Sequence, residues 1–167
     1  MTLAVVFPGQ GSQSVGMLAA LAAEYPAVQA TFAEASEVLG YDLWRLVQEG
    51  PEEALNATER TQPAMLTAGV AVWRVWNAQG AVRPAVMAGH SLGEFTALVC
   101  SGAMGFTDAV KAVQFRGRVM QESVPAGTGA MAAILKLEAA KVKQACEAAA
   151  QATGQVVQID PAMAVHR

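Results

Sequence analysis

Charged residues, cysteine and histidine are scarce in this sequence, and each shortage disfavours a class of protein. Lys, Arg, Asp and Glu make up only 15% of the 167 residues, and the net charge is -3. Proteins that bind nucleic acid by neutralising phosphates are normally basic, so no nucleic-acid partner is expected. Cys100 and Cys146 lack CxxC spacing, and His90 and His166 lie far apart. We therefore expect free thiols and no zinc site.

Long apolar runs are also missing, although the mean hydropathy is positive at +0.30. No stretch of about 18 uncharged apolar residues occurs, so we expect no membrane span. Residues 1–8 lack the basic and apolar regions of a signal peptide. Because 53% of the residues are hydrophobic, the chain can form a real core. These features favour a soluble, cytoplasmic protein.

Short apolar runs alternate with helical patterns, which predicts an α/β fold with a parallel sheet. Strands are expected over residues 3–7, 84–88 and 130–137, and residues 155–157 are a candidate for the start of a fourth. Helices are expected up to residue 24, over residues 26–39 and 42–47, from residue 51, and over residues 61–78, 94–99, 107–122 and 138–152.

A Gly-x-Ser-x-Gly motif at residues 89–93 follows one expected strand and precedes a helix. This context is that of a nucleophile elbow, a tight turn that exposes a serine at the end of a strand. Ser91 would be the nucleophile, and the N–H of Leu92 would face an oxyanion near the helix N-terminus. Gly89 and Gly93 would avoid collisions across the turn. The alternative is a serine that caps a helix after a glycine-rich turn.

A serine nucleophile needs a general base, and the sequence offers no convincing one. His90 is adjacent to Ser91, but neighbouring residues on such a turn point in different directions, so we expect a structural role for it. His166 is next to last in the chain and belongs to no recognisable motif. The sequence therefore shows a nucleophile without its partner.

Two further positions suit an anionic ligand. Residues 8–13 form a Gly/Gln/Ser-rich turn after the first strand, where backbone N–H groups can face an anion. Strand carboxyl ends meet at the ligand crevice of an open α/β sheet, so an amide near Gln10 is a candidate second oxyanion donor. Arg116 offers a planar fork that suits a carboxylate, although a solvated helix arginine is the more usual reading.

Five segments occur in a recognisable order along the chain. They are Val-Phe-Pro-Gly-Gln-Gly-Ser-Gln at 6–13, Thr-Gln-Pro-Ala at 61–64, Gly-His-Ser-Leu-Gly-Glu-Phe at 89–95, Phe-Arg-Gly at 115–117 and Gly-Thr-Gly-Ala-Met-Ala-Ala at 127–133. Together they resemble the malonyl-CoA:acyl-carrier-protein transacylase family over about the first 150 residues. Five ordered motifs are much more specific than the elbow alone.

The resemblance implies a two-step transfer in fatty acid biosynthesis. Ser91 would take a malonyl group from malonyl-CoA and pass it to the phosphopantetheine thiol of acyl carrier protein. The backbone N–H groups of Gln10 and Leu92 would form the oxyanion hole, and Arg116 would pair with the malonyl carboxylate. No metal or redox cofactor is implied, because coenzyme A enters as the substrate thioester.

The resemblance also implies a division of the chain. Residues 1–124 would belong to an α/β-hydrolase-like subdomain with a parallel sheet and flanking helices. Residues 125–167 would begin a ferredoxin-like small subdomain, with a tail from about residue 158 that does not follow the family pattern. The chain would be shortened relative to the family, and the family's catalytic histidine would lie in the missing part. Another chain is then a possible cover for exposed core surface.

Two alternatives to the transferase remain open. One is a serine esterase or thioesterase of the α/β-hydrolase type, which Arg116 and the loop at residues 8–13 disfavour. The other is an inactive fragment that lacks the catalytic histidine but still binds a ligand or partner.

Overall fold

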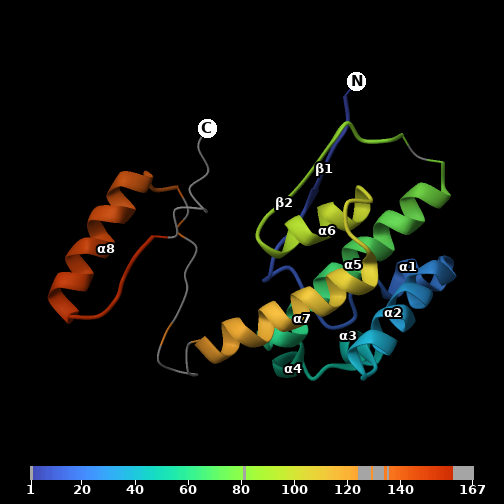
Figure 1. Ribbon diagram of the computed structural model, residues 1–167, viewed down its shortest axis with the longest axis horizontal. Coiled ribbons are helices and arrows are strands. Elements are labelled where there is room, and N and C mark those ends of the chain that lie inside the picture. Colours follow the sequence, from blue (N-terminus) through green and yellow to red (C-terminus); the bar gives the residue numbers. More distant parts are fainter. Residues whose placement is uncertain (1, 81, 124–128, 130–133, 135, 160–167) are drawn as a thin grey trace. The chain divides into compact units, whose positions relative to one another are not determined.

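A computed structural model describes residues 2–80, 82–123, 129, 134 and 136–159 (Figure 1). The chain divides into two compact units, Met1–Ala126 and Gly127–Arg167. The described part of the first unit contains β1 (Ala4–Phe7), α1 (Ala19–Glu24), α2 (Pro26–Leu39), α3 (Leu43–Glu49), α4 (Glu52–Asn56), α5 (Thr58–Ala78), β2 (Val86–Gly89), α6 (Leu92–Cys100) and α7 (Phe106–Ser123). The second unit contains α8 (Ala139–Thr153).

The two strands of the first unit pair in parallel, as predicted for an α/β fold. Their register joins Ala4 to Val86 and Phe7 to Gly89, so the two strands end at the same level. The ladder continues one residue further, where the N–H of His90 donates to the carbonyl of Phe7 at 3.2 Å. The loop after β1 and the turn after β2 therefore lie beside each other.

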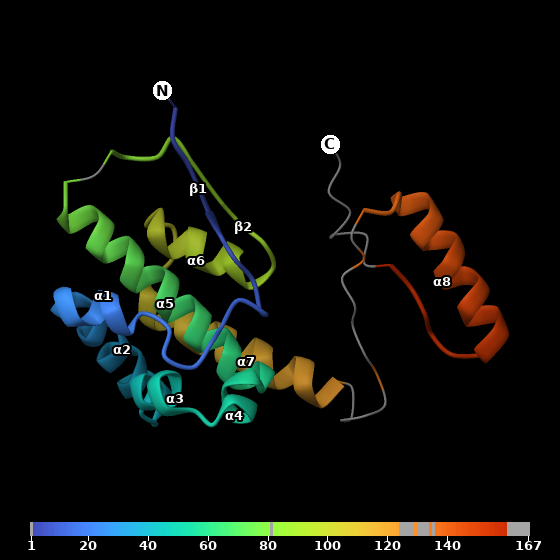
Figure 2. The ribbon, with the colours of Figure 1, turned by 180° about the vertical axis from the view of Figure 1, so that it is seen from behind.

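Helix α5 is the centre of the first unit and is buried on almost every side of its amino-terminal half. Helices α2, α6 and α7 pack against it, and Figure 2 shows the same arrangement from behind. The helix begins at Thr58, one turn before the predicted start at Thr61. The Ala57 carbonyl causes this, because it accepts from the N–H groups of Arg60 at 2.7 Å and Thr61 at 2.8 Å.

The strands expected from the sequence are confirmed only in part. The predicted strands at residues 3–7 and 84–88 are confirmed as β1 and β2. Most of the expected strand at residues 130–137 lies outside the described residues. The suggested strand at residues 155–157 is wrong, because these residues have irregular backbone and pair with no described strand. A segment this short needs a partner to supply its hydrogen bonds.

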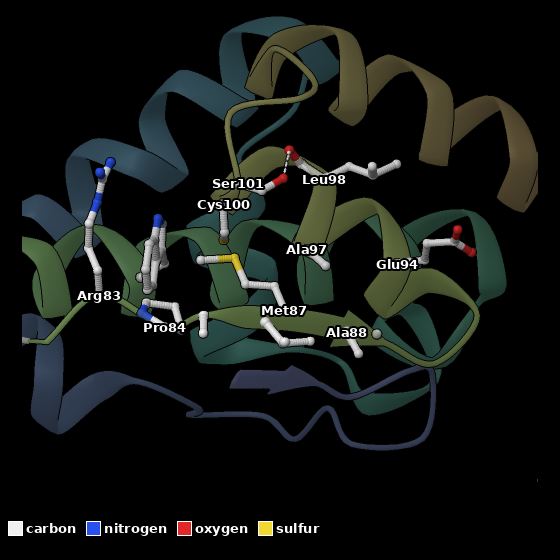
Figure 3. A pocket seen from close by; sticks show the side chains of 13 residues that line it. Arg83, Pro84, Met87, Ala88, Glu94, Ala97, Leu98, Cys100 and Ser101 are labelled. Carbon is white, nitrogen blue, oxygen red and sulfur yellow. Dashed lines mark hydrogen bonds between the residues drawn. The ribbon is translucent and has the colours of Figure 1, made fainter. Parts of the chain in front are cut away.

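The sheet of the first unit is open on one face. The side chains of Val6 and Val86 are 75% and 56% exposed, although parallel sheets are normally covered on both faces. A cavity of about 700 Å³ runs along β2 and α6 (Figure 3), and one of about 430 Å³ lies between β1 and α5. Neither cavity is lined by Ser91 or Arg116. Apolar surface beside both strands is therefore available for further packing.

Within the described residues, no helix is both long and apolar enough to span a bilayer.

We expect the two cysteines to differ in reactivity. Burial raises the pKa of the Cys100 thiol to about 12, partly opposed by the charge of Arg74, whereas the partly exposed Cys146 lies in the second unit. With a pKa near 12, only about one Cys100 thiol in ten thousand is ionised at pH 8. Iodoacetamide should therefore modify Cys146 at least about a hundredfold faster, as read by mass spectrometry.

The control for this prediction is the same reaction in urea, where both thiols should react at similar rates. Raising the pH should accelerate the reaction of folded Cys100 about tenfold per pH unit, with no plateau until the pH nears 12, since the thiolate is the reactive form. Equal rates for both cysteines in the folded protein at pH 8 would contradict the buried position of Cys100.

Candidate active site

Ser91 stands at the turn between β2 and α6, in the position that the elbow motif predicts. Its φ of 53° and ψ of -109° lie outside the usual regions for a residue with a side chain. The turn is tight, since the Gly93 N–H donates to the His90 carbonyl at 2.9 Å. Strained backbone of this kind is typical of nucleophile elbows, and Ser91 is solvent-exposed at the strand end.

Close backbone contacts explain the glycines around Ser91. A Cβ on Gly89 would lie 1.9 Å from the carbonyl carbon of Gly93, and a Cβ on Gly93 would lie 2.2 Å from the Phe7 carbonyl oxygen. A Cβ on Gly9 would lie 2.9 Å from the carbonyl oxygen of His90. Each neighbour is main chain and cannot rotate away. Helix α6 therefore packs directly on the end of β1 only because these positions lack side chains.

Gly93→Ala tests this packing. Overpacking typically costs about 1–3 kcal/mol, and a contact of 2.2 Å to main chain should place this substitution at the upper end. Urea unfolding measures the loss of unfolding free energy. Glu94→Ala is the matched control, since Glu94 is exposed on the next position of α6 and should cost less than about 1 kcal/mol. Equal midpoints for the two variants would refute the packing argument.

Arg116 contacts Ser91 directly, although 25 residues separate them in the sequence. The Nη2 group of Arg116 on α7 donates to the Ser91 Oγ atom at 2.9 Å. The guanidinium also lies near the Phe95 ring, with 6.0 Å between the Cζ atom and the ring centroid. The reading of Arg116 as a merely solvated helix residue is therefore wrong, because packing of α7 brings its charge to the serine.

Gln62 is the residue that the sequence reasoning did not single out. It is fully buried on α5, and its Oε1 atom accepts from the Nη1 group of Arg116 at 2.8 Å. Its Nε2 group donates to the Met120 Sδ atom at 3.3 Å. The available signal was a glutamine within the Thr-Gln-Pro-Ala segment, at the start of a long apolar helix.

The loop after β1 is held by side-chain hydrogen bonds to α4 and α5. Gln10 Nε2 donates to Thr58 Oγ1 at 3.2 Å, and Gln13 Nε2 donates to Asn56 Oδ1 at 2.7 Å. Gln10 thus lies in the loop beside the elbow. Leu92 is the first residue of α6, where backbone N–H groups have no acceptor within their own helix. The oxyanion roles of both residues stay predictions.

The general base remains unassigned within the described residues. The backbone of His90 is bound to β1, and its Nδ1 atom lies 3.0 Å from where a Cβ on Gly9 would stand. The structural role expected for His90 stays a prediction. His166 lies outside the described residues. No group of three or more His, Cys, Asp or Glu residues that could hold a metal ion occurs in the part of the chain described.

Comparisons with known proteins agree on one family. The family model of the acyl transferase domain matches residues 4–165. The malonyl CoA-acyl carrier protein transacylase of Salmonella typhimurium is 64% identical over 154 residues, which are 92% of this chain and 49% of that protein. The chain spans about half the length of the curated relatives it matches.

The solved structures that resemble this chain are also malonyl transacylases. The malonyl CoA-acyl carrier protein transacylase of Coxiella burnetii has a TM-score of 0.90 at 57% identity, over 95% of this chain and 49% of that one. A malonyl-transacylase in complex with a type II PKS acyl-carrier protein has a TM-score of 0.89 at 57% identity, over 95% of this chain and 50% of that one. These likenesses confirm the α/β fold.

Proposed function

Because this chain belongs to the acyl transferase domain family, we propose that it carries the nucleophile and the carboxylate site of a malonyl transferase. The Ser91 Oγ atom attacks the thioester carbonyl of malonyl-CoA, the bond to sulfur breaks, and coenzyme A leaves as the thiol. The phosphopantetheine thiol of an acyl carrier protein then attacks the malonyl-serine ester and restores the serine. The reaction needs no metal or redox cofactor, since coenzyme A is part of the substrate.

The contact between Arg116 and Ser91 carries this proposal. A malonyl group on Ser91 places its free carboxylate a few bonds from the Oγ atom, within reach of the guanidinium at 2.9 Å. The Nη2 group then exchanges the Oγ atom for the carboxylate, and Nη1 keeps its bond to Gln62. An acetyl group has no carboxylate, so it would leave the cation without this partner. Selectivity for malonyl donors follows.

The N–H groups of Gln10 and Leu92 are the proposed donors to the oxyanion. Leu92 opens α6, so its amide lies at the positive end of that helix dipole. Gln10 comes from the loop that ends β1, which the parallel register places beside the elbow. Donors fixed by strand ends and a helix terminus need little reorganisation when charge develops on the carbonyl oxygen.

The chain spans about half of its curated relatives, and we propose that the general base lies in the portion it does not match. The strands β1 and β2 then belong to a hydrolase-like parallel sheet, and further packing covers the face that is exposed at Val6 and Val86. The second unit is the start of a ferredoxin-like subdomain. The enzyme works in the cytoplasm.

Covalent loading of Ser91 is the direct test. After incubation with malonyl-CoA, mass spectrometry should detect a malonyl group on the wild-type protein and none on Ser91→Ala. Adding acyl carrier protein should remove the group from Ser91 and place it on the carrier. Free malonate released at one rate with and without the carrier would favour a thioesterase. A folded wild-type chain that forms no adduct would favour an inactive fragment.

Arg116→Ala tests the carboxylate site. A hydrogen bond to a charged group contributes about 1.5–3 kcal/mol, so the preference for malonyl-CoA over acetyl-CoA should fall by about 10- to 100-fold. Competition between the two thioesters for Ser91 measures this ratio. Arg118→Ala is the matched control, because Arg118 is exposed on the same helix and pairs only weakly with Glu122 at 3.9 Å. An unchanged ratio in Arg116→Ala would remove its assigned role.

A further inference from the structure

Core packing does not explain why a glutamine is buried at position 62. Gln62 is fully buried, yet its Nε2 group donates to a thioether sulfur, which is a weak acceptor. Burying an amide with poor compensation costs free energy, whereas a methionine or leucine of similar volume would cost none. A buried glutamine at this position therefore has to be explained by its other bond, the one to Arg116.

The two partners of Gln62 select the same orientation of its amide. A guanidinium has only donors, so the Oε1 atom must face Arg116. The Met120 Sδ atom has no proton to donate, so the Nε2 group must face it. In the flipped amide, two donors would meet at Arg116 and two lone-pair groups would meet at Met120. Met120 and Arg116 therefore fix one rotamer together.

The packing of two helices makes this arrangement possible. Arg116 and Met120 are four residues apart on α7, so they share one face of that helix. Gln62 enters between them from α5. At Gly117 the helices approach so closely that a Cβ would lie 2.8 Å from the Glu59 Cα atom. This close approach brings a short amide side chain within hydrogen-bond distance of the guanidinium.

We propose that Gln62, oriented by Met120, is a positioning residue that holds the Arg116 guanidinium beside Ser91 and thereby sets the preference for carboxylate-bearing acyl groups. This inference rests on the function proposed above. Gln62 binds Nη1 only, so Nη2 stays available for the Ser91 oxygen or the substrate carboxylate. The guanidinium is ordered before the substrate arrives, and the entropy of ordering it is not lost on binding.

The first measurement needs no catalysis. In the nitrogen-15 NMR spectrum of the 167-residue chain, the Arg116 guanidinium should give a protected signal that shows slow rotation. Gln62→Met should abolish that signal, and Gln62→Glu, which restores an oxygen acceptor, should bring it back. Met120→Leu should weaken it while keeping the volume of a side chain that is 37% exposed. A wild-type-like signal in Gln62→Met would overturn the inference, as would no protected signal in the wild type.

The matched control is Thr67→Val on the same helix. Thr67 is also fully buried, and its Oγ1 atom has no hydrogen-bond partner in the described structure. Its substitution removes a buried polar group without touching Arg116. The Arg116 signal should therefore be unchanged in Thr67→Val. Loss of the signal in this variant too would show that it reports general loosening of α5, and would overturn the positioning role.

The second measurement is the malonyl-to-acetyl ratio of kcat/KM for loading Ser91. Gln62→Met should lower this ratio about tenfold, mainly by raising KM for malonyl-CoA. Gln62→Glu should not restore the ratio, because its carboxylate neutralises the Arg116 guanidinium and so competes with the malonyl carboxylate. A lower ratio in Arg116→Ala with an unchanged ratio in Gln62→Met would overturn the positioning role and leave the proposed function standing. An unchanged ratio in Arg116→Ala would overturn the carboxylate site itself, and the role of Gln62 with it.

Discussion

The site depends on the close approach of main chain to main chain where β1, β2 and α6 meet. Gly93 lies against the Phe7 carbonyl, and Gly89 lies against Gly93, at distances where no Cβ fits. Because the parallel register ends both strands at one level, this approach also sets the loop of Gln10 beside the turn of Ser91. Any side chain at these glycines would separate the strand ends from the helix. The strained backbone of Ser91 is tolerated because its neighbours on both sides are held in this way.

The packing of α7 against α5 is a second constraint, and it places the charge of Arg116 in the site. Helix α5 is buried on most sides, so the helices around it have little freedom to shift. Helix α7 lies against it with Gly117 at the contact, and this sets Arg116 both at Ser91 and at Gln62. The elbow supplies a nucleophile, and the α5–α7 packing supplies the group that can recognise a negative acyl substituent. Chemistry and selectivity thus come from two separate packing contacts.

The described sheet of the first unit leaves apolar surface uncovered. Val6 and Val86 expose apolar surface on the sheet, and cavities run along both β1 and β2. The same open surface agrees with a chain that spans about half of its curated relatives. Several features of the described half were predictable from sequence, because they depend on local patterns: the strand ends, the elbow and most helix bounds. The start of α5 at Thr58 was missed, since it depends on the carbonyl of Ala57 rather than on an apolar pattern.

By itself, the sequence determined the identity of the local units. Two apolar runs, a Gly-x-Ser-x-Gly motif and helical periodicity are enough to place Ser91 on a turn between a strand and a helix. Only the tertiary structure decided which distant side chains meet that serine. From the residue pattern alone Arg116 looked like a solvated helix arginine, and only the family resemblance assigned it to a carboxylate. Gln62 looked like part of a core helix, because hydrogen bonds between residues 54 positions apart leave no periodic signal. Helix packing brings them together, and the spacing of residues along a chain does not record it.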